Sequence, residues 1–256
     1  MTAGLPGEQP GPERARLLVV VAVPAEAEAV LRGLTAGPDA SPGGAPEPVA
    51  LPGGTLERVA HPSGVTVDVL AGGVGPGAAA AAAATALTAA RYDLVVSAGI
   101  AGGFAPRAPI GATVIATAIV AADLGAETPE GFADVTELGF GTVRHTPAPG
   151  AAALAALALD AVTGTVLTVS TVTGGAGRAA ELTARHPDAV AEAMEGFGVA
   201  EAAARHGVPV FELRTVSNAV GPRDRAAWRI GEALAALERA FAALPHPALV
   251  KEAGRG

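Results

Sequence analysis

The chain has 256 residues, half of them hydrophobic, and a formal net charge of −8. One compact α/β domain accounts for this length, and an acidic balance without a basic stripe argues against a nucleic-acid partner. The chain contains no cysteine, which excludes disulfides, thiolate nucleophiles and thiolate metal ligands and favours a reducing, cytoplasmic location.

The N-terminal region combines a polar segment with one short apolar run. Residues 1–15 are rich in glycine, proline and charge, which predicts a disordered tail. The apolar run 17–23 follows two arginines, but a proline and two glutamates come directly after it, where a secretory signal would stay apolar. No run approaches the roughly 20 apolar residues of a membrane span, so no membrane partner is expected.

Apolar runs alternate with alanine-rich or amphipathic runs along the rest of the chain. The expected strands are 17–23, 65–71, 93–99, 112–120, 165–170 and 208–216. The expected helices are 24–34, 77–91, 151–159, 178–185, 198–206 and 225–244. Pro24 suits a first helical turn, and Gly207 suits a helix C-terminal cap. This alternation predicts an α/β fold with helices on both faces of a sheet.

Two stretches do not follow this alternation. Residues 37–56 are crowded with proline and glycine, which predicts an exposed loop or a hairpin connection. Residues 123–149 hold Phe132 and Phe140 among turn residues, and a loop of this length with aromatic side chains is suited to cover a site.

Two glycine-rich loops each follow an expected strand. The loop Gly72 to Gly77 opens a helix, so its backbone N–H groups suit an anion or a sugar, but it lacks the spacing of dinucleotide and P-loop motifs and a tight turn is favoured. The loop Ser97 to Gly103 is built of small residues that let a flat ring approach the backbone closely. A structural turn and a ligand wall both remain open for this second loop.

Two carboxylates and one amide are the candidate chemical groups. Glu26 follows the first strand, where it suits either chemistry or the helix dipole. Glu195 lies in an apolar region between Met194 and Gly196, so it needs a hydrogen-bonding partner such as a pair of ribose hydroxyls, unless it lies at the surface. Asn218 follows an apolar strand and is otherwise a turn or cap residue. Ligands of open α/β sheets bind at the C-terminal edge of the strands.

These pieces together resemble the nucleosidase branch of the nucleoside phosphorylase and hydrolase superfamily, from Leu17 to about Leu244. The matching motifs are the Val23-Pro24-Ala25-Glu26 strand end, the loop from Ser97 to Phe104, Ala193-Met194-Glu195-Gly196, and Arg214-Thr215-Val216-Ser217-Asn218. The resemblance implies a three-layer α/β/α fold of the purine nucleoside phosphorylase type with a twisted mixed central sheet. It places one domain at 16–246 and a tail at 247–256. It implies a small nucleoside substrate, no cofactor or metal, and a site commonly completed across a homo-oligomer interface.

Carried over from the family, Glu26 matches the carboxylate that positions and deprotonates the attacking water, with Glu28 as the second choice. Glu195 matches the glutamate that holds the ribose hydroxyls, and Met194 the side chain beneath the sugar. The backbone of Ala101 and Gly102 matches the lining of the base pocket.

Asn218 matches the family position beside the purine, where the methylthioadenosine and adenosylhomocysteine nucleosidases carry Asp. An Asp accepts from an exocyclic amine and gives a proton to N7, whereas an Asn offers its NH₂ group to a 6-oxo group and to N7. The expected base is therefore hypoxanthine, and Asn218 is either a catalytic or a base-reading residue. Ala193 is a second departure, because many relatives carry another Glu there.

The pair Ser217-Asn218, followed by the segment 220–225 and Trp228, most resembles the futalosine hydrolase family of menaquinone biosynthesis, which releases hypoxanthine from futalosine. Futalosine carries a carboxyphenyl group beyond C5′, for which Arg223 and Arg225 are candidates. Both also suit a solvated surface.

Two further groups complete the candidate substrate-binding residues. Arg214 suits either the base or a bracing contact with Glu26. Phe104, with Phe132 and Phe140, suits an aromatic wall, and core packing is the alternative for each.

Three alternatives to this activity stay open. A methylthioadenosine or adenosylhomocysteine nucleosidase would share most of the motifs. A purine nucleoside phosphorylase would need a phosphate loop, and the Gly-Asp-Pro type loop of that branch is missing after the first strand. A non-catalytic nucleoside-binding module would keep Glu195 but would not need the water-activating carboxylate Glu26.

Overall fold

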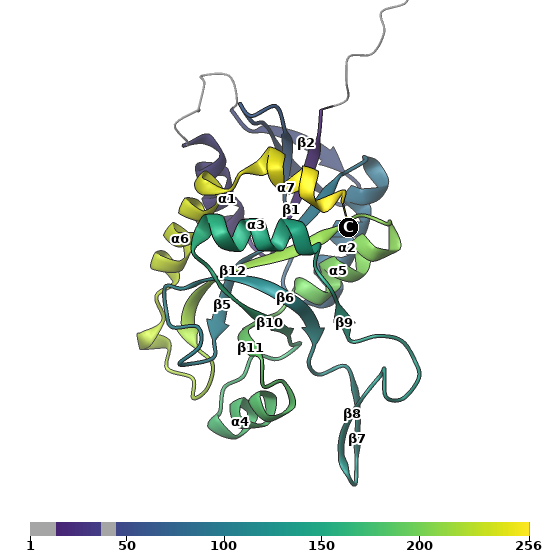
Figure 1. The fold of residues 1–256 in the computed structure, drawn as a ribbon, viewed down its shortest axis with the longest axis vertical. Coiled ribbons are helices and arrows are strands. Elements are labelled where there is room, and N and C mark those ends of the chain that lie inside the picture. The colour runs from purple at the N-terminus through teal and green to yellow at the C-terminus, as the bar shows by residue number, and fades with distance from the viewer. Residues whose placement is uncertain (1–13, 37–44, 256) are drawn as a thin grey trace, which may run out of the picture.

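The computed structural model describes residues 14–36 and 45–255, and these form a sheet between two helical layers (Figure 1). The strands are β1 (Arg16–Val21), β2 (Glu47–Leu51), β3 (Gly54–Ala60), β4 (Thr66–Ala71), β5 (Leu94–Gly103), β6 (Thr113–Ala121), β7 (Gly125–Thr128), β8 (Gly131–Asp134), β9 (Arg144–His145), β10 (Val162–Thr168), β11 (Ala189–Ala193) and β12 (Val210–Ala219). The helices are α1 (Pro24–Thr35), α2 (Pro76–Ala89), α3 (Pro149–Leu159), α4 (Ala176–Arg185), α5 (Gly196–Arg205), α6 (Ile230–Ala243) and α7 (His246–Ala253). The expected three-layer α/β fold with a mixed sheet is confirmed.

The sheet runs in the order β11-β10-β6-β12-β5-β1-β4-β3-β2, and β11 also pairs with β5. This extra antiparallel pairing closes β5, β12, β6, β10 and β11 into a ring, while β1 to β4 extend from it as an open sheet. The parallel pairs join β1 to β4 and β5, β10 to β6 and β11, and β12 to β5. The C-terminal end of β5 therefore meets both β11 and β12.

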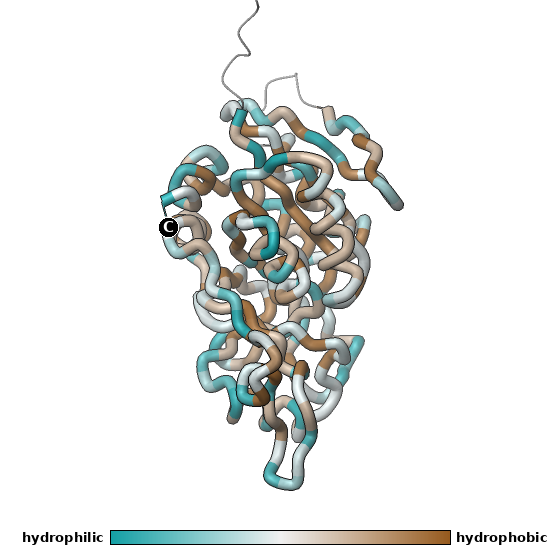
Figure 2. Tube along the Cα trace, turned by 90° about the vertical axis from the view of Figure 1, so that its right-hand side faces the viewer, coloured by the Kyte–Doolittle hydropathy of each residue, from teal (hydrophilic) through white to brown (hydrophobic). Residues whose placement is uncertain are grey.

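Two hydrophobic clusters lie on opposite faces of the sheet. One joins α2 and α5 to the sheet through residues such as Ala83 and Val199, and the other joins α1, α3, α6 and α7 through residues such as Val30 and Phe241. Figure 2 shows apolar segments running through the middle of the molecule between more polar outer segments. The small alanine side chains let these helices pack closely on the strands, as the sequence suggests.

Several boundaries follow the expected turn chemistry. Pro24 is the first residue of α1. Gly207 has a φ of 66° directly after α5, a left-handed conformation that glycine adopts without strain. Within 37–56, β2 and the start of β3 form the hairpin that was one of the two expectations for that stretch, although residues 37–44 lie outside the described part.

Other elements differ from the expectation. The stretch 123–149 holds the β7–β8 hairpin and β9. The single helix expected at 225–244 is a 3₁₀ turn at 225–227 followed by α6, because Trp228 is extended with a ψ of 134°. The short strand β11 has no counterpart among the expected strands.

The C-terminal segment also differs, because a tail is expected at 247–256 and the structure folds 246–253 into α7. Leu249 and Ala253 of α7 are buried in the cluster that holds α3 and α6. Four apolar residues in eight are enough for one buried helical face, which the sequence reading overlooked. Of the expected tail at 1–15, residues 1–13 lie outside the described part, and Arg14 and Ala15 lead into β1. Among the described residues, no helix is both long and apolar enough to cross a membrane.

Burial of His246 at the start of α7 gives the fold an acid-sensitive point. The side chain is 1 % exposed, and its ring lies 4.7 Å from that of His61. Burial, with a smaller repulsion from His61, lowers the pKa of His246 to about 3. The native state therefore holds this imidazole neutral at pH values where an unfolded chain would protonate it.

We expect the free energy of unfolding to fall as the pH drops from about 6.5 towards 3, because only the unfolded state binds the His246 proton in that window. The pKa difference corresponds to a loss of roughly 3 kcal/mol by pH 4. Urea denaturation of the wild type and of His246→Phe between pH 4 and pH 8 measures it. The free energy of unfolding of the wild type should fall more steeply than that of the variant as the pH drops, and parallel curves would contradict the assignment.

Candidate active site

The carboxylate of Glu26 is held by three backbone donors. Its Oε2 accepts from the N–H groups of Ala22 at 2.9 Å and Val23 at 3.2 Å, and its Oε1 accepts from Ile100 N–H at 2.8 Å. The residue is 3 % exposed. Glu26 therefore ties the end of β1 and the first turn of α1 to the C-terminal half of β5, with its position set by the main chain rather than by flexible side chains.

Arg214 on β12 is a fully buried cation surrounded by acceptors. Its Nε donates to Glu212 at 2.8 Å, its Nη1 to Glu195 at 3.2 Å and its Nη2 to Ser97 Oγ at 3.1 Å. Burial alone would lower the pKa of Arg214, but the carboxylates of Glu212, Glu195 and Glu26 outweigh it and raise that pKa. The guanidinium therefore stays charged and fixes the acids around it.

Glu195 lies at the N-terminus of α5 and is 5 % exposed. Besides Arg214, it accepts from Gly75 N–H at 3.2 Å through Oε1 and from Met194 N–H at 3.3 Å through Oε2. Gly75 belongs to the first glycine-rich loop, so one of its backbone donors serves Glu195. The partner that the sequence demanded for this buried carboxylate is thus an arginine with two backbone amides.

Glu26 and Arg214 meet at Gly99 on β5. A side-chain carbon at position 99 would lie 2.6 Å from Glu26 Oε1 and 2.9 Å from Arg214 Nη1, and Gly99 has a φ of 152°. Only glycine fits here, because any side chain would collide with both groups. Because Arg214 Nη1 also contacts Glu195, two acidic residues from distant parts of the sequence converge on one region at the C-terminal edge of the sheet.

Asn218 and Ser217 lie at the end of β12, beside the small-residue loop. Ser217 Oγ donates to Ala101 O at 3.2 Å and to Asn218 Oδ1 at 2.9 Å, while Asn218 Nδ2 donates to Ala219 O at 3.1 Å. Gly102 pairs with Asn218, and a side chain at Gly102 would come within 3.2 Å of Asn218 Nδ2. The amide is therefore oriented with one N–H engaged and lies next to the expected base pocket.

The remaining predicted residues separate into two groups. Met194 is half-buried beside Glu195, and Glu28 is exposed on α1 and away from the converging acids. Phe104 is 3 % exposed in a core cluster with Val169 and Leu182, so the core-packing alternative describes it.

The other candidates lie outside this core. Arg223 and Arg225 are exposed, and the guanidinium carbon of Arg223 lies 5.6 Å from the ring centre of Trp228. Phe132 packs under the guanidinium of Arg185, and Phe140 is 83 % exposed. Neither ring belongs to the core cluster that holds Phe104.

Sequence reasoning missed several polar groups of this region. Glu212 was not singled out, although Glu212 and Arg214 are two residues apart in an apolar strand, and this spacing places both on one face. Glu192 on β11 was also missed. It is 5 % exposed and lies three residues before Glu195, in a strand too short to give a clear alternating pattern.

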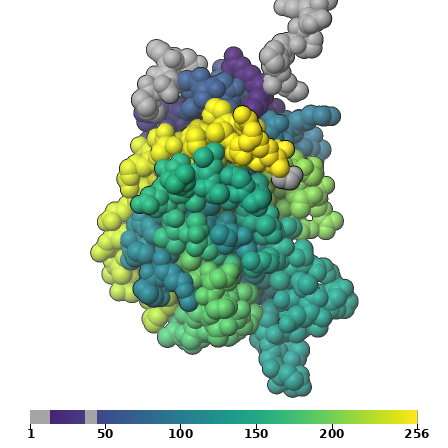
Figure 3. All heavy atoms as spheres, viewed as in Figure 1, coloured from purple at the N-terminus to yellow at the C-terminus, as the bar shows by residue number. Residues whose placement is uncertain are grey.

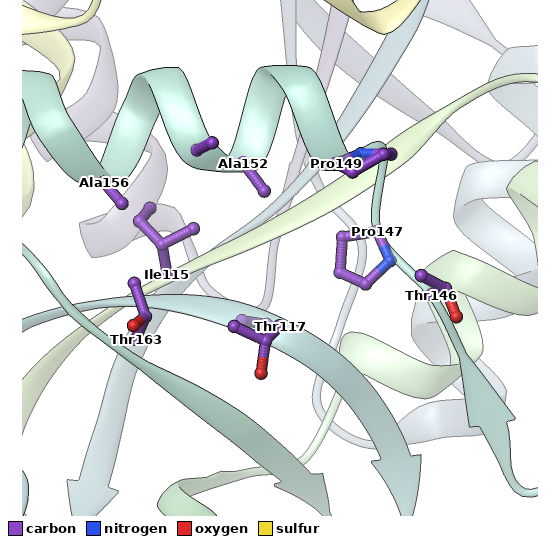
Figure 4. A pocket seen from close by; sticks show the side chains of 10 residues that line it. Ile115, Thr117, Thr146, Pro147, Pro149, Ala152, Ala156 and Thr163 are labelled. Atoms are coloured by element: carbon purple, nitrogen blue, oxygen red, sulfur yellow. The ribbon is translucent and has the colours of Figure 1, made fainter. Parts of the chain in front are cut away.

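Two cavities of about 270 Å³ each lie near the sheet. The first, shown in Figure 4, lies between α3 and β6 and is lined by apolar groups such as Ile115, Ala152 and Ala156, so it offers no group for acid–base chemistry. The second is lined by the N-terminus of α2, by Thr168 of β10 and by Phe197 of α5. Phe197 N–H donates to Thr168 Oγ1, and both residues line this second cavity. Phe197 is two residues after Glu195 in the sequence.

Comparison with known proteins finds one family and several relatives. The phosphorylase superfamily matches residues 16–247. A futalosine hydrolase of Streptomyces coelicolor is 66% identical over 182 residues, 69% of this chain and 77% of its own. A futalosine hydrolase of Acidothermus cellulolyticus is 47% identical over 232 residues, 89% of each chain. The structure of the Helicobacter pylori futalosine hydrolase superposes with a TM-score of 0.75 at 17% identity, over 93% of this chain and 98% of that one, which shows the shared fold.

Replacing Arg214 with methionine should lower the free energy of unfolding by about 3–5 kcal/mol, because Glu212 and Glu195 would be left buried without their cation. Urea denaturation at neutral pH measures the loss. Arg205→Met on the exposed side of α5, where Arg205 pairs with Glu201, is the matched control and should change stability little. Equal losses in the two variants would show that Arg214 does not hold the acids together.

Proposed function

Because the chain belongs to the phosphorylase superfamily, and within it to the futalosine hydrolases, we propose that it hydrolyses the N-glycosidic bond of futalosine, a step of menaquinone biosynthesis. The products are hypoxanthine and dehypoxanthinyl futalosine. The observation that carries this proposal is the packing of Glu26 and Arg214 against the bare backbone of Gly99, with Glu195 bound to the same arginine.

In the proposed reaction, Glu26 orients water and takes a proton from it as the water attacks the anomeric carbon. The three backbone donors keep the carboxylate in one place, so little reorganisation is needed during attack. A positioned general base contributes roughly 10²- to 10⁴-fold to the rate. An anionic nucleophile such as phosphate would be repelled by this carboxylate, which favours hydrolysis over phosphorolysis.

Glu195 holds the ribose in this proposal. Its Oε1 keeps one acceptor site beyond the bond from Gly75 N–H, whereas Oε2 already accepts from Met194 N–H and from Arg214, so Oε1 is the oxygen that accepts from a ribose hydroxyl. Met194, half-buried beside it, packs under the sugar. The negative charge of Glu195 also favours the positive charge that grows on the ribose ring as the glycosidic bond lengthens.

Asn218 stabilises the departing purine. One N–H of its amide group is engaged by Ala219 O, which leaves the other for N7 or the 6-oxo group of hypoxanthine. Ser217 fixes the amide orientation by donating to Oδ1, so the NH₂ group rather than the oxygen is presented. The backbone of Ala101 and Gly102 lines the base pocket in this arrangement.

The carboxyphenyl group of futalosine is assigned to the segment after β12. Arg223 is exposed, forms no ion pair within the described residues, and lies against Trp228. Arg223 thus offers a cation for the carboxylate, and Trp228 offers an apolar ring for the phenyl group. Its backbone N–H donates to Gly174 O at 3.2 Å, so this segment is anchored to the loop after β10.

The same proposal includes a homo-oligomer that acts in the cytoplasm. Leu124, Leu138 and Phe140 are exposed apolar side chains on the segment 122–145, which projects from the body of the molecule at the lower right of Figures 1 and 3. Exposed apolar groups on a projecting segment favour contact with another subunit.

The activity is tested by incubating the protein with futalosine, methylthioadenosine or inosine, each with and without phosphate, and identifying the freed base by chromatography. We expect hypoxanthine from futalosine without phosphate. Glu26→Ala should reduce this release by at least about 10²-fold, since it removes the general base. Glu28→Ala, two residues along the same helix, should leave it unchanged. Equal turnover in the Glu26→Ala variant and the wild type would remove Glu26 from the mechanism.

Asn218→Asp should shift the preference towards 6-amino purine nucleosides, because a carboxyl group accepts from an exocyclic amine where the amide donates to an oxo group. The measurement is the ratio of kcat/KM for futalosine to that for its 6-amino analogue. Ser217→Ala, which frees the amide to turn its oxygen towards the base, should shift the ratio in the same direction by a smaller factor. An unaltered ratio in Asn218→Asp would count against the base-reading role.

A further inference from the structure

A second buried acid, Glu192, lies outside the contacts described for catalysis. It is 5 % exposed on β11, and within residues 14–36 and 45–255 it forms no ion pair. Its partners are the backbone N–H and the hydroxyl of Thr173, which donate to Oε1 and Oε2 respectively. Burial raises the pKa of this carboxyl, although the Thr173 donors oppose the rise. A buried acid without a cation is costly and marks a candidate functional position.

The sheet register places Glu192 and Asn218 on opposite sides of one glycine. Gly102 on β5 pairs with Glu192 of β11 on one side and with Asn218 of β12 on the other. Directly paired residues project from the same face of a sheet. Asn218 Nδ2 lies 3.2 Å from where a side chain at Gly102 would begin, which confirms that this face is the one the amide occupies.

The spacing between these two groups suits a flat ring. Neighbouring strands lie about 4.8 Å apart, so the backbones that carry Glu192 and Asn218 are separated by roughly 10 Å with only glycine between them. A side-chain carbon at position 102 would lie 2.9 Å from Val220 Cγ2 and 3.2 Å from Asn218 Nδ2, so Val220 packs beside this glycine. The slot is therefore lined by Gly102 and Val220, with a carboxylate on one side and an amide on the other.

Two loops enclose the same slot. Thr173, which binds Glu192, is followed by Gly174, whose carbonyl accepts from Arg223 N–H in the segment after Asn218. Arg229 N–H then donates to Ser217 O at 2.8 Å, which returns that segment to the end of β12. The groups on both sides of Gly102 are thus joined by hydrogen bonds around one site.

The chemistry of the two sides matches one class of purine. A 6-oxopurine presents an N1–H donor beside its O6 acceptor, whereas adenine presents an N1 acceptor beside its amino group. A carboxylate only accepts, and the NH₂ group of an amide only donates. A carboxylate at N1 with an amide at O6 or N7 therefore complements hypoxanthine, and the N1 lone pair of adenine would face a negative charge.

We propose that Glu192 is a specificity-determining residue whose carboxylate accepts a hydrogen bond from N1–H of the 6-oxopurine, opposite the Asn218 amide. This inference deepens the proposed futalosine hydrolysis and rests on it for the substrate. Asn218 alone reads only the O6 and N7 edge, whereas the pair distinguishes the oxo from the amino form at two adjacent atoms.

Glu192→Gln tests the proposal because glutamine still accepts from Thr173 N–H and can donate to its hydroxyl, so the loop contact is kept and the charge is removed. The measurement is the ratio of kcat/KM for futalosine to that for its 6-amino analogue. We expect this ratio to fall by roughly 10- to 100-fold, the effect of losing a charged hydrogen bond to the correct base and a repulsion to the wrong one. Glu47→Gln on β2, at the far edge of the sheet, is the matched control and should leave the ratio unchanged.

Two further measurements separate this role from a structural one. Thr173→Val loosens the loop but keeps the carboxylate, so it should lower both kcat/KM values by a similar factor. Dissociation constants for free hypoxanthine and free adenine, measured by calorimetry, should show the same loss of preference in Glu192→Gln without any dependence on turnover. If Glu192→Gln does not fold, Glu192→Asp keeps the charge and withdraws it from the base, and the ratio should again fall.

The outcomes distinguish the two levels of the argument. If the wild type releases no hypoxanthine from futalosine, the proposed function fails, and the base-binding preference still tests Glu192. If the wild type is active but Glu192→Gln lowers both substrates equally and keeps its preference for hypoxanthine over adenine, Glu192 only anchors the loop and the inference is overturned.

Discussion

The structure depends on one buried cation. Arg214 has no exposed surface, and its guanidinium contacts Glu212, Glu195 and Ser97, which come from β12, the α5 N-terminus and β5. An arginine in such a place is stable only if acids compensate it, and the acids are stable only if it is present. This mutual requirement joins elements that are more than a hundred residues apart, and it binds Glu195 to the same guanidinium that packs beside Glu26 at Gly99.

The sheet gives this cluster its place. The parallel strands β1, β5 and β12 end on one side, and the antiparallel pairing of β11 with β5 closes the ring beyond them. Residues at the end of β5 are therefore reached from two neighbouring strands at once. Glu192 and Asn218 flank Gly102 for this reason, and Glu26 reaches the backbone of Ile100 from the neighbouring end of β1.

The fold class and most long elements follow from the sequence, because apolar runs and alanine-rich runs differ clearly in period and length. Glu26 and Glu195, which approach the same guanidinium, and Asn218 at the end of β12 were singled out through motifs next to strand ends. Glu192 and β11 were not, since a five-residue strand carries too short a pattern and its position beside β5 is a matter of tertiary pairing. The helix α7 was missed for a similar reason, because its eight residues gain stability only from packing. Glu212 could have been found from its two-residue spacing to Arg214, whereas the contact of Arg214 with Ser97 depends on strand pairing that no local pattern encodes.

Because backbone N–H groups hold Glu26, the direction in which its carboxylate points depends on the register of β1 and β5. Both oxygens are held by main-chain N–H groups, so no neighbouring side chain needs to be retained for the carboxylate to point correctly. Sequence drift around the acid is therefore tolerated as long as β1 and β5 keep their alignment, whereas an insertion or deletion in either strand would redirect the acid. Divergent members of such a fold can change many neighbouring side chains, with Gly99 kept bare, and still hold the carboxylate in the same place.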